Sequence, residues 1–428
     1  MKKTLLPILL FITVFLTGYF AQRFTFSNQE CLGLFLWTPD FLRECLSSSR
    51  PISHFIGSWL VQFYRFEFFG EAITALIVTL IYLEIRFILS RAGIKCDAAA
   101  VLGACICWSR IARSSGPDRG VSLLLIGAVV CLICLLIKNR TKWELKPLFS
   151  FIGGIAVLLG ASFFIATDKE IRDTERWSIV EQAATNQAWD LLLETATPLQ
   201  TETSRDMIPY ALLALNEKGL LGEKMFLYPI KGPQDLDTEG LNTRRGFLFS
   251  SILYDRLGCT NEAVHQTFQA ACYLRHGSSF RTLRRLVQFY EKIGNKDLVI
   301  KYCAILSRST LHKKFISSHM NDSSQLRVPE EMPDSNQSYS AGIMNHDQQA
   351  DLILLQKEGI SSRLMLDRYF CYFLARRDLV NFASQFEIAR DLYQEIPRHF
   401  NEALIMLQGQ PAANNAYAEY YASDGRQL

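Results

Sequence analysis

The sequence has few charged residues for its length of 428. Asp, Glu, Lys and Arg make up 20% of the chain, whereas hydrophobic residues make up 49% and aromatic residues 12%. Such a composition excludes an intrinsically disordered protein and a collagen-like one. The mean hydropathy of +0.09 is also high for an ordinary cytosolic enzyme. We therefore expect part of the chain to lie in a membrane.

The familiar motifs of metal and cofactor chemistry are missing as well. None of the seven histidines pairs with another at His-x-x-x-His spacing, and there is no His-Glu-x-x-His motif, no Gly-rich phosphate loop and no Gly-x-Ser-x-Gly turn. Cys131 and Cys134 have the spacing of a redox motif, but they stand within an apolar run, where they are expected to pack in a membrane helix. The sequence predicts no metal and no cofactor.

Charge is distributed unevenly along the chain. Residues 1–167 contain 16 Lys or Arg against 9 Asp or Glu, a net charge of +7, whereas residues 168–428 contain 29 against 33, a net charge of −4. Apolar runs of about twenty residues, long enough to cross a bilayer as helices, occur only in the first part. We therefore predict an all-α protein with a polytopic transmembrane domain at 1–167 and a soluble domain after it. The five predicted spans are Thr4–Ala21, Phe68–Leu89, Cys96–Ala112, Val121–Ile137 and Leu148–Ala166.

Loop charges predict the side of the membrane on which the tail lies. Short cation-rich loops stay in the cytoplasm, and such cations occur at Lys2, at Lys3 and four times within 138–146. Both groups of cations can be cytoplasmic only if an even number of spans separates them. The short 96–112 segment therefore has to cross the membrane. Five spans then place the tail outside, which predicts a multi-pass protein of the inner (cytoplasmic) membrane with a periplasmic C-terminal domain. Three cations just after the last span argue the other way.

The predicted outer loop, residues 22–67, contains three acidic residues of interest. Membrane sugar transferases that use lipid-linked donors resemble this chain in one respect, because they hold catalytic acids in the first outer loop. Glu30, Asp40 and Glu44 are the candidate acids here, acting as base or metal ligand. The alternative is that Asp40 caps a helix after Pro39 and that Glu44 is solvated.

Two further features of the outer loop leave alternatives open. Cys31 and Cys45 could form a disulfide if the loop is in an oxidising compartment, or remain two buried thiols. The apolar stretch Pro51–Tyr64 is typical of a helix lying in the membrane interface, with its Trp and Tyr at the level of the headgroups. The alternative is a segment packed on the helix bundle.

The tail has helical periodicity and no alternating strand pattern. Short connections between successive helices predict antiparallel pairs. Residues 318–347 are rich in Ser, Asn, Gln, Asp and Pro, which indicates a flexible insertion between helical residues 168–317 and 348–428. The predicted helices are Thr174–Asn186, Ala188–Thr197, Ser204–Lys218, Arg245–Leu257, Asn261–Leu274, Phe280–Ile293, Lys296–Ser307, Arg363–Ala375, Leu379–Tyr393 and Pro397–Leu407.

A weak internal repeat indicates stacked helix pairs. Tyr254 and Gly258 recur as Tyr290 and Gly294 at an offset of 36 residues. This pattern resembles tetratricopeptide (TPR) repeats, in which a Tyr packs in the first helix and a Gly turns the chain. The Trp and Leu-Gly of a regular TPR first helix are missing, as is the closing proline. We expect a TPR-like α-solenoid, with an irregular helical bundle as the alternative.

The most basic part of the tail is Arg275–Lys314, with ten cations against two acids. Within it, Arg281, Arg284 and Arg285 have the spacing of one helix face, and apolar residues occupy the opposite stripe. We expect these three arginines to point to solvent and to bind an acidic partner or anionic lipid heads. An ordinary solvated face is the alternative. Nucleic acid is not expected, because the tail as a whole is acidic.

Three stretches resemble a known family. They are Asn28-Gln29-Glu30, Leu34–Phe41 (LFLWTPDF) and Ile396–Leu404 (IPRHFNEAL), and they look like parts of an uncharacterised family of multi-spanning envelope proteins of Gram-negative anaerobes with a helical repeat tail. The resemblance implies no activity and no catalytic residue. The chain departs from the family pattern in having fewer spans than expected.

These observations favour a binding role. We expect a membrane-anchored envelope scaffold or assembly factor, whose helical repeats bind protein partners and whose bundle contacts membrane lipid. The alternative is a lipid-linked sugar glycosyltransferase, or a relic of one, that uses the acids of the outer loop.

Overall fold

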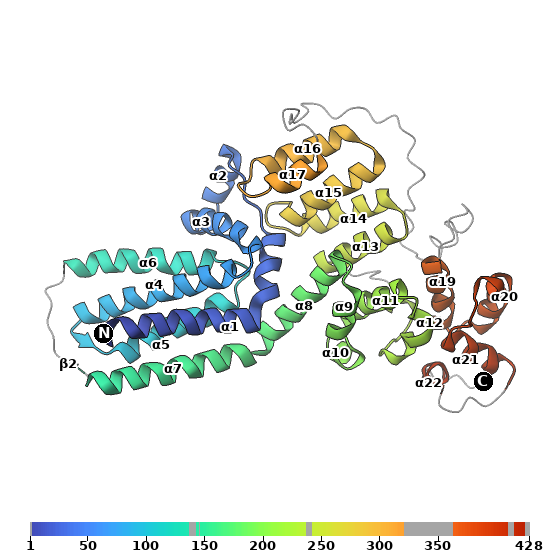
Figure 1. Ribbon diagram of the computed structural model, residues 1–428, viewed down its shortest axis with the longest axis horizontal. Coiled ribbons are helices and arrows are strands. Elements are labelled where there is room, and N and C mark those ends of the chain that lie inside the picture. Colours follow the sequence, from blue (N-terminus) through green and yellow to red (C-terminus); the bar gives the residue numbers. More distant parts are fainter. Residues whose placement is uncertain are drawn as a thin grey trace. The chain divides into compact units, whose positions relative to one another are not determined.

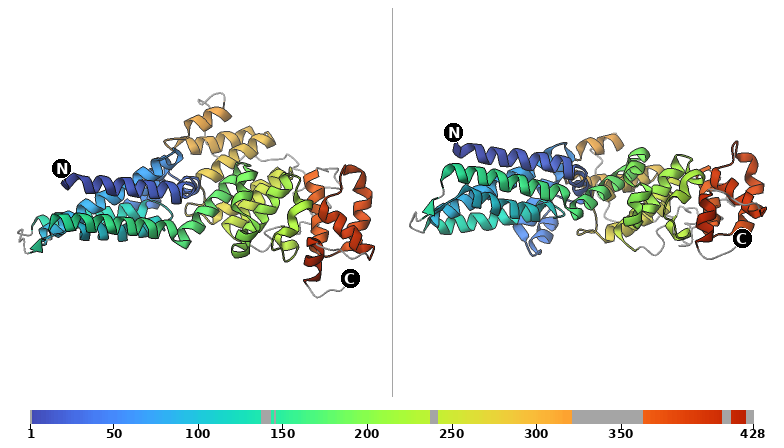
Figure 2. Two further views of the ribbon diagram at one scale, coloured as in Figure 1. Left: turned by 60° about the horizontal axis from the view of Figure 1, so that its bottom comes forward. Right: turned by 90° about the horizontal axis from the view of Figure 1, so that it is seen from below.

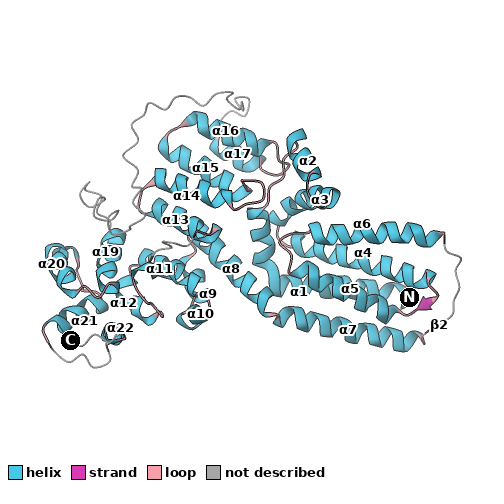
Figure 3. Cartoon of the chain, turned by 180° about the vertical axis from the view of Figure 1, so that it is seen from behind, coloured by secondary structure: helices cyan, strands magenta, loops and turns pink. Residues whose placement is uncertain are grey.

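The computed structural model describes residues 2–136, 143–144, 146–236, 242–320, 363–409 and 415–423. Within these ranges the chain is almost entirely helical, as Figure 3 shows, which confirms the predicted all-α class. The strands of the described chain are β1 (Ile94–Lys95) and β2 (Trp143–Glu144), two residues each, which pair in parallel. The predicted insertion at 318–347 lies outside the described residues from 321 onward.

Contacts between Cα atoms divide the chain into two units, which we describe separately. Unit 1 comprises Met1–Ser178, Ser279–Arg284 and Asp297–Val328, and unit 2 comprises Ile179–Ser278, Arg285–Lys296 and Pro329–Leu428. The predicted boundary after residue 167 therefore differs from the division in the structure. The chain leaves unit 1 after Ser178 and returns to it twice.

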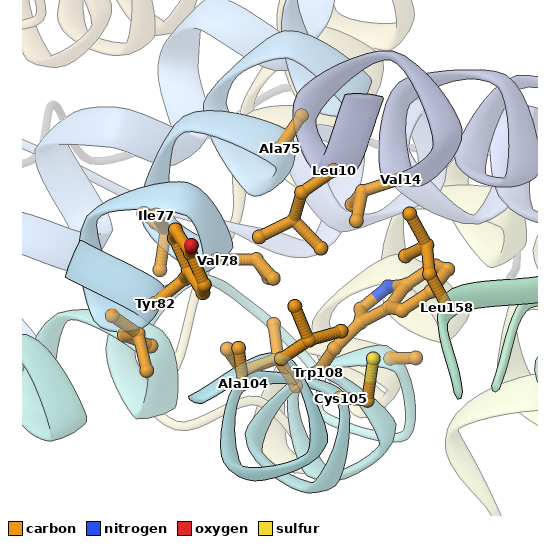
Figure 4. Close-up of a cluster of buried hydrophobic side chains, with 14 of the residues drawn as sticks. Leu10, Val14, Ala75, Ile77, Val78, Tyr82, Ala104, Cys105, Trp108 and Leu158 are labelled. Atoms are coloured by element: carbon orange, nitrogen blue, oxygen red, sulfur yellow. The ribbon is translucent and has the colours of Figure 1, made fainter. Parts of the chain in front are cut away.

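Five helices pack side by side in unit 1, as Figures 1 and 2 show. Their shared core is made of aliphatic and small side chains, with Trp108 and Tyr82 as its large members. Figure 4 shows Leu10 and Val14 from one helix converging on it with Val78 and Leu158 from two others. The five helices are α1 (Lys2–Leu32), α4 (Phe69–Arg91), α5 (Asp97–Ala112), α6 (Asp118–Leu135) and α7 (Pro147–Thr167).

The prediction of five spans is wrong by one. Among the described residues, four helices are long and apolar enough to cross a membrane. They are α1 from Leu5 onward, α4, α6 and α7. The predicted span Cys96–Ala112 corresponds to α5, which has 16 residues. At 1.5 Å per residue its length is about 24 Å, less than the roughly 30 Å of a bilayer core. Nevertheless α5 packs between α4 and α7 in the same hydrophobic core.

Side-chain contacts fix the directions of α1 and α7. Leu6, near the start of α1, lies beside Gly154, near the start of α7. Eleven residues later, the Thr17 hydroxyl lies 2.6 Å from that of Ser162. The two helices therefore run parallel, so the N-terminus of the chain and the end of α7 are at opposite ends of the bundle.

The outer loop folds into short helices at the end of the bundle where α1 ends. They are α2 (Pro39–Leu46), α3 (Pro51–Val61) and the 3₁₀ turn η1 (Gln62–Arg65). α3 packs against the start of α6, where Gly57 meets the backbone of Asp118. Tyr64 is buried, with its ring 5.5 Å from that of Phe26. This stretch therefore packs on the bundle, which was the alternative to the interfacial prediction.

Short helices joined by tight turns make up unit 2. The predicted tail helices are present with similar bounds, and Arg363–Ala375 is reproduced residue for residue. Helix α8 (Lys169–Thr185) begins in unit 1 and ends in unit 2, and α15 (Phe280–Ile293) passes from unit 1 to unit 2 after Arg284. The remaining helices of unit 2 are α9 (Trp189–Thr195), α10 (Pro198–Thr203), α11 (Ile208–Glu217), α12 (Leu221–Lys224), α13 (Arg244–Arg256), α14 (Thr260–Cys272), α19 (Arg363–Ala375), α20 (Leu379–Ala389), α21 (Arg398–Leu407) and α22 (Ala416–Ala422), with 3₁₀ turns η2 (Arg205–Met207), η3 (Met225–Leu227), η4 (Pro233–Asp235) and η6 (Arg390–Leu392).

The repeated Tyr and Gly mark one turn geometry. Gly258 and Gly294 both have left-handed φ, +83° and +80°, and the next amide donates back to the carbonyl of Tyr254 or Tyr290 over 2.8 and 2.9 Å. Each is a Schellman-type helix end, in which Gly supplies the left-handed residue. The same turn occurs without glycine at Gln187 and Arg377, at φ +58° and +60°. A common turn therefore joins successive helices even where the sequence repeat is not visible.

Candidate functional site

The structure separates the three acids proposed as catalytic residues. Asp40 and Glu44 lie on α2 and are exposed, and Asp40 forms an ion pair with Arg43 of the same helix at 3.0 Å. Glu30 is buried near the end of α1. Over the described part of the chain, no group of three His, Cys, Asp or Glu side chains is arranged to hold a metal ion. The geometry therefore does not gather these acids at one reaction centre.

Glu30 is instead held by cationic and polar groups from far along the chain. Arg284 donates from Nη1 to Oε1 over 3.0 Å and from Nη2 to Oε2 over 3.1 Å. This is the bidentate geometry in which a guanidinium binds a carboxylate most strongly. His312 Nε2 lies 3.6 Å from Oε1. Both partners belong to the segments through which the chain returns to unit 1.

A break in α1 positions Glu30. The helix is interrupted at Gln22, and the Gln22 side chain donates to the carbonyl of Ala112 at the end of α5 over 2.7 Å. The helix then restarts, and the amides of Phe24 and Thr25 donate to the Glu175 carboxylate over 2.8 and 2.7 Å. A carboxylate at a helix N-terminus satisfies amides that have no partner inside the helix. The outer part of α1 is therefore fixed by α5 and α8.

The prediction that Arg281, Arg284 and Arg285 point to solvent is wrong. Only 4% of Arg281 and 7% of Arg285 is exposed. Arg281 donates to the Asn28 side chain and Arg284 to Glu30, both in unit 1, whereas Arg285 donates to the Ser251 hydroxyl within unit 2 over 3.0 Å. The periodic pattern placed the arginines opposite the apolar stripe correctly, but the structure covers both faces of α15. A partner-binding role for them stays a prediction, and it would require these contacts to open.

A turn at residues 308–312 completes the arrangement. The Trp37 amide donates to the carbonyl of Arg308 over 2.8 Å, and the Trp37 indole donates to the Thr310 hydroxyl over 3.1 Å. The Gln62 side chain accepts from the amide of Thr310 over 3.1 Å. We call these contacts, together with Asn28–Arg281 and Glu30–Arg284–His312, the clasp. All of its members belong to unit 1.

The pKa of His312 lies below its ordinary value. Burial lowers its pKa, the nearby Arg284 acts in the same direction, and the Glu30 carboxylate opposes them. The ring lies against that of Phe280, with centroids 4.2 Å apart, and its Nδ1 shares a hydrogen bond with the Ser309 hydroxyl over 2.7 Å. Arg284 donates two hydrogen bonds to the Glu30 carboxylate, and the His312 ring lies beside the same carboxylate. A buried carboxylate bound in this way is suited to holding segments together and poorly suited to acting as a base.

Several members of the clasp were not predictable from the sequence. His312 and Gln62 stand in no motif, and Asn28 and Glu30 stand in the family-like stretch 28–30, which does not indicate their partners. Glu30 and Arg284 are 254 positions apart. The acidic group that Arg284 binds in the structure is thus Glu30 of the same chain. No disulfide joins Cys31 and Cys45 in the structure.

Comparison with known proteins gives a family and no function. A protein-family model described as "Family of unknown function (DUF6057)" matches residues 1–179 and 170–425. No curated protein and no solved structure matches the chain. Because the two matches together cover nearly the whole sequence, the chain belongs to this family.

Proposed function

We propose that this DUF6057 protein is a membrane-anchored envelope scaffold that binds protein partners through its helical tail. The clasp is the observation that carries this proposal. A tail needed only as a tethered domain would require no more than the connection from α7 to α8. Here two later segments of the tail return to unit 1 and are fixed by a buried ion pair. The clasp thus builds the outer end of unit 1 from distant parts of the sequence, and a stable folded surface of this kind suits a scaffold.

The TPR-like character of the tail is part of the proposal. The recurring Schellman-type turn between successive helices supports a repeat architecture, and helical repeats provide extended binding surfaces without a cofactor. The envelope location is also part of it. Parallel α1 and α7 support a tail on the opposite side of the membrane from the N-terminus, whichever way α5 is counted.

α20 offers a candidate partner surface in unit 2. Its inner face packs Phe382 and Phe386 into an aromatic core. Its outer face exposes 71% of Val380 and 79% of Ile388, and the η6 turn that follows exposes 60% of Leu392. Protein interfaces bury apolar groups of this kind at their centres.

The test is crosslinking with mass spectrometry in native membranes. We expect the full-length chain to crosslink to a reproducible set of proteins, and Val380→Lys combined with Ile388→Lys to remove part of that set. Leu199→Lys is the matched control, because Leu199 is also 71% exposed but lies on α10. An identical set of crosslinked proteins from all three chains would contradict a role for α20. No specific crosslinked protein from any of them would contradict the scaffold.

Topology is tested by reporter fusions at Thr141 and Gln200. We expect opposite compartments, with Thr141 cytoplasmic. The same compartment for both would contradict a tail outside the cytoplasm.

The glycosyltransferase alternative stays a prediction that no contact in the described structure favours. It can be tested most cleanly at Asp40 and Glu44, because their side chains are exposed and their loss should not disturb the fold. Glycolipid and glycoprotein profiles unchanged by Asp40→Ala and Glu44→Ala would remove these two acids from consideration. Glu30→Ala is less informative, because it also breaks the clasp.

A further inference from the structure

Phenylalanine side chains gather where α1 and α4 meet the outer loop. Phe20 is 80% exposed, and Phe66, Phe68 and Phe69 are each nearly half exposed. The Phe68 ring lies 5.6 Å from that of Tyr19, and the Phe66 and Phe69 rings are 5.5 Å apart. We call Phe20, Phe66, Phe68 and Phe69 the aromatic group. Side chains of this size are rarely left in water together without a binding role.

The aromatic group continues the apolar outer stripe of the candidate spans. On α1, Leu5, Ile8, Ile12 and Leu16 are exposed at helical spacing, and Phe20 is the next member of the series. On α4, Leu76, Leu80 and Leu83 extend the exposed surface away from Phe69. Because the outer stripe of a spanning helix faces lipid, a surface continuous with it is expected to meet the same lipid.

Charged groups mark the outer limit of this surface. Arg23 forms an ion pair with Glu67 at 2.6 Å, and its guanidinium lies 5.5 Å from the centre of the Tyr19 ring. Both charged residues are partly exposed. The order from apolar helix to aromatic rings to a solvated ion pair is the order of groups across a membrane interface.

Phe68 has a backbone conformation that favours glycine. Its φ is +70°, in the left-handed region where side chains larger than those of Asn or Asp are rare. Strain of this kind persists where the position of a side chain matters. Phenylalanine at this position therefore carries a backbone strain that glycine would relieve.

We propose that the aromatic group is an interfacial anchor that binds phospholipid at the boundary between headgroups and acyl chains, on the side of the membrane where α1 ends. It sets the depth of the bundle in that leaflet. The occupant is lipid rather than a second protein chain, because the surface is continuous with the outer stripes of α1 and α4.

Two measurements on the full-length chain in phosphatidylcholine vesicles test the anchor. In the first, hydroxyl-radical footprinting reports which aromatic side chains meet water. Tyr273, which is 53% exposed on the tail, is the matched control for Phe68 and Phe69. We expect Phe68 and Phe69 to be oxidised at least about fivefold more slowly than Tyr273, because water is excluded from the acyl boundary.

In the second measurement, phosphatidylcholine with a photoreactive diazirine near the start of one acyl chain reports contact with lipid. We expect adducts on peptides that contain Phe20 and residues 66–69, and fewer adducts on the latter peptide in the Phe68→Gly variant. Oxidation of Phe68 and Phe69 at the rate of Tyr273 would overturn the proposal. Protection from oxidation without lipid adducts would also overturn it, because another protein chain would then cover the aromatic group.

Discussion

Different interactions stabilise the outer part of unit 1 and the C-terminal part of unit 2. In unit 1, the clasp joins residues about 250 positions apart through a buried Glu30–Arg284 ion pair and hydrogen bonds. In unit 2, α19, α20 and α21 meet in an aromatic core, where the Phe386 ring lies 5.3 Å from that of Phe370 and 5.5 Å from that of Phe400. The first is directional and long-range, the second apolar and local.

Each unit is sensitive to a different kind of substitution. An aromatic core loses stability in proportion to the volume removed, and its neighbours can partly collapse into the space. A buried ion pair behaves differently, because removal of one partner leaves an uncompensated charge, whereas removal of both can be nearly neutral. The two units should therefore respond differently to single and paired substitutions.

The largest effect is expected in the aromatic core of unit 2. Phe386→Ala removes a fully buried ring and should lower the free energy of local unfolding by about 3–5 kcal/mol. Hydrogen exchange of α19–α21, measured by mass spectrometry in detergent, reports this change. Ile388→Ala on the same helix is the control, and because Ile388 is exposed it should change exchange by less than about 0.5 kcal/mol. If Phe386→Ala and Ile388→Ala changed hydrogen exchange equally, the aromatic core would not be what stabilises α19–α21.

Breaking the clasp should have a similar but smaller effect in unit 1. Glu30→Ala leaves Arg284 without its carboxylate and should cost about 3 kcal/mol. We expect faster hydrogen exchange at 279–284 and 308–312, with little change in unit 2. Glu44→Ala removes an exposed carboxylate and is the matched control.

Paired substitution separates the clasp from ordinary packing. Glu30→Met combined with Arg284→Met should be less destabilising than the sum of the two single changes, because no lone buried charge remains. If the two effects simply add, the ion pair does not hold these segments together.

Acid should weaken both units through one buried histidine in each. Burial is the main cause that lowers the pKa of His312 and of His399, and the carboxylates of Glu30 and Glu402 oppose it. The unfolded chain therefore takes up these protons at higher pH, near 6.5, than the folded chain does. Stability is complete above that pH and falls as pH drops below it, by at most about 1.4 kcal/mol per pH unit for each histidine.

The measurement is hydrogen exchange between pH 7.5 and 5.5, corrected for intrinsic rates. His312→Gln should reduce the pH dependence in unit 1 alone, and His399→Gln should reduce it in unit 2 alone. Loss of the pH dependence in both units from one substitution would mean that the two histidines do not act locally.

The smallest expected effect comes from the turns. Gln187 is exposed and has left-handed φ, so Gln187→Gly should relieve strain and stabilise unit 2 by about 0.5 kcal/mol. Gly258→Ala places a side chain in the same conformation and should destabilise by about 1 kcal/mol. Denaturant unfolding of the full-length chain in detergent measures both. Stabilisation by Gly258→Ala would show that this turn does not need glycine.

Local features of the chain were predictable from sequence. Helix formation depends on contacts within four residues, so the apolar runs and helical periods predicted the bounds of α4, α7, α15 and α16 (Lys296–Ser307) within a few residues. The turns at Gly258 and Gly294 followed from glycine spacing, because left-handed φ is a local requirement. The length of an apolar run also defines a candidate span, which is why the short 96–112 segment was the weak point.

Which charges are buried depends on long-range packing that no local pattern predicts. The spacing of Arg281, Arg284 and Arg285 is that of a solvated helix face, and it becomes an interior one only because the chain covers α15 on both sides. The sequence determined that these arginines share a face and that Glu30 follows a membrane helix. Their meeting across 254 positions required the chain to return to unit 1. Helical periodicity specifies which residues lie together on a helix, whereas the partner of a buried charge is set by which distant segments pack against it.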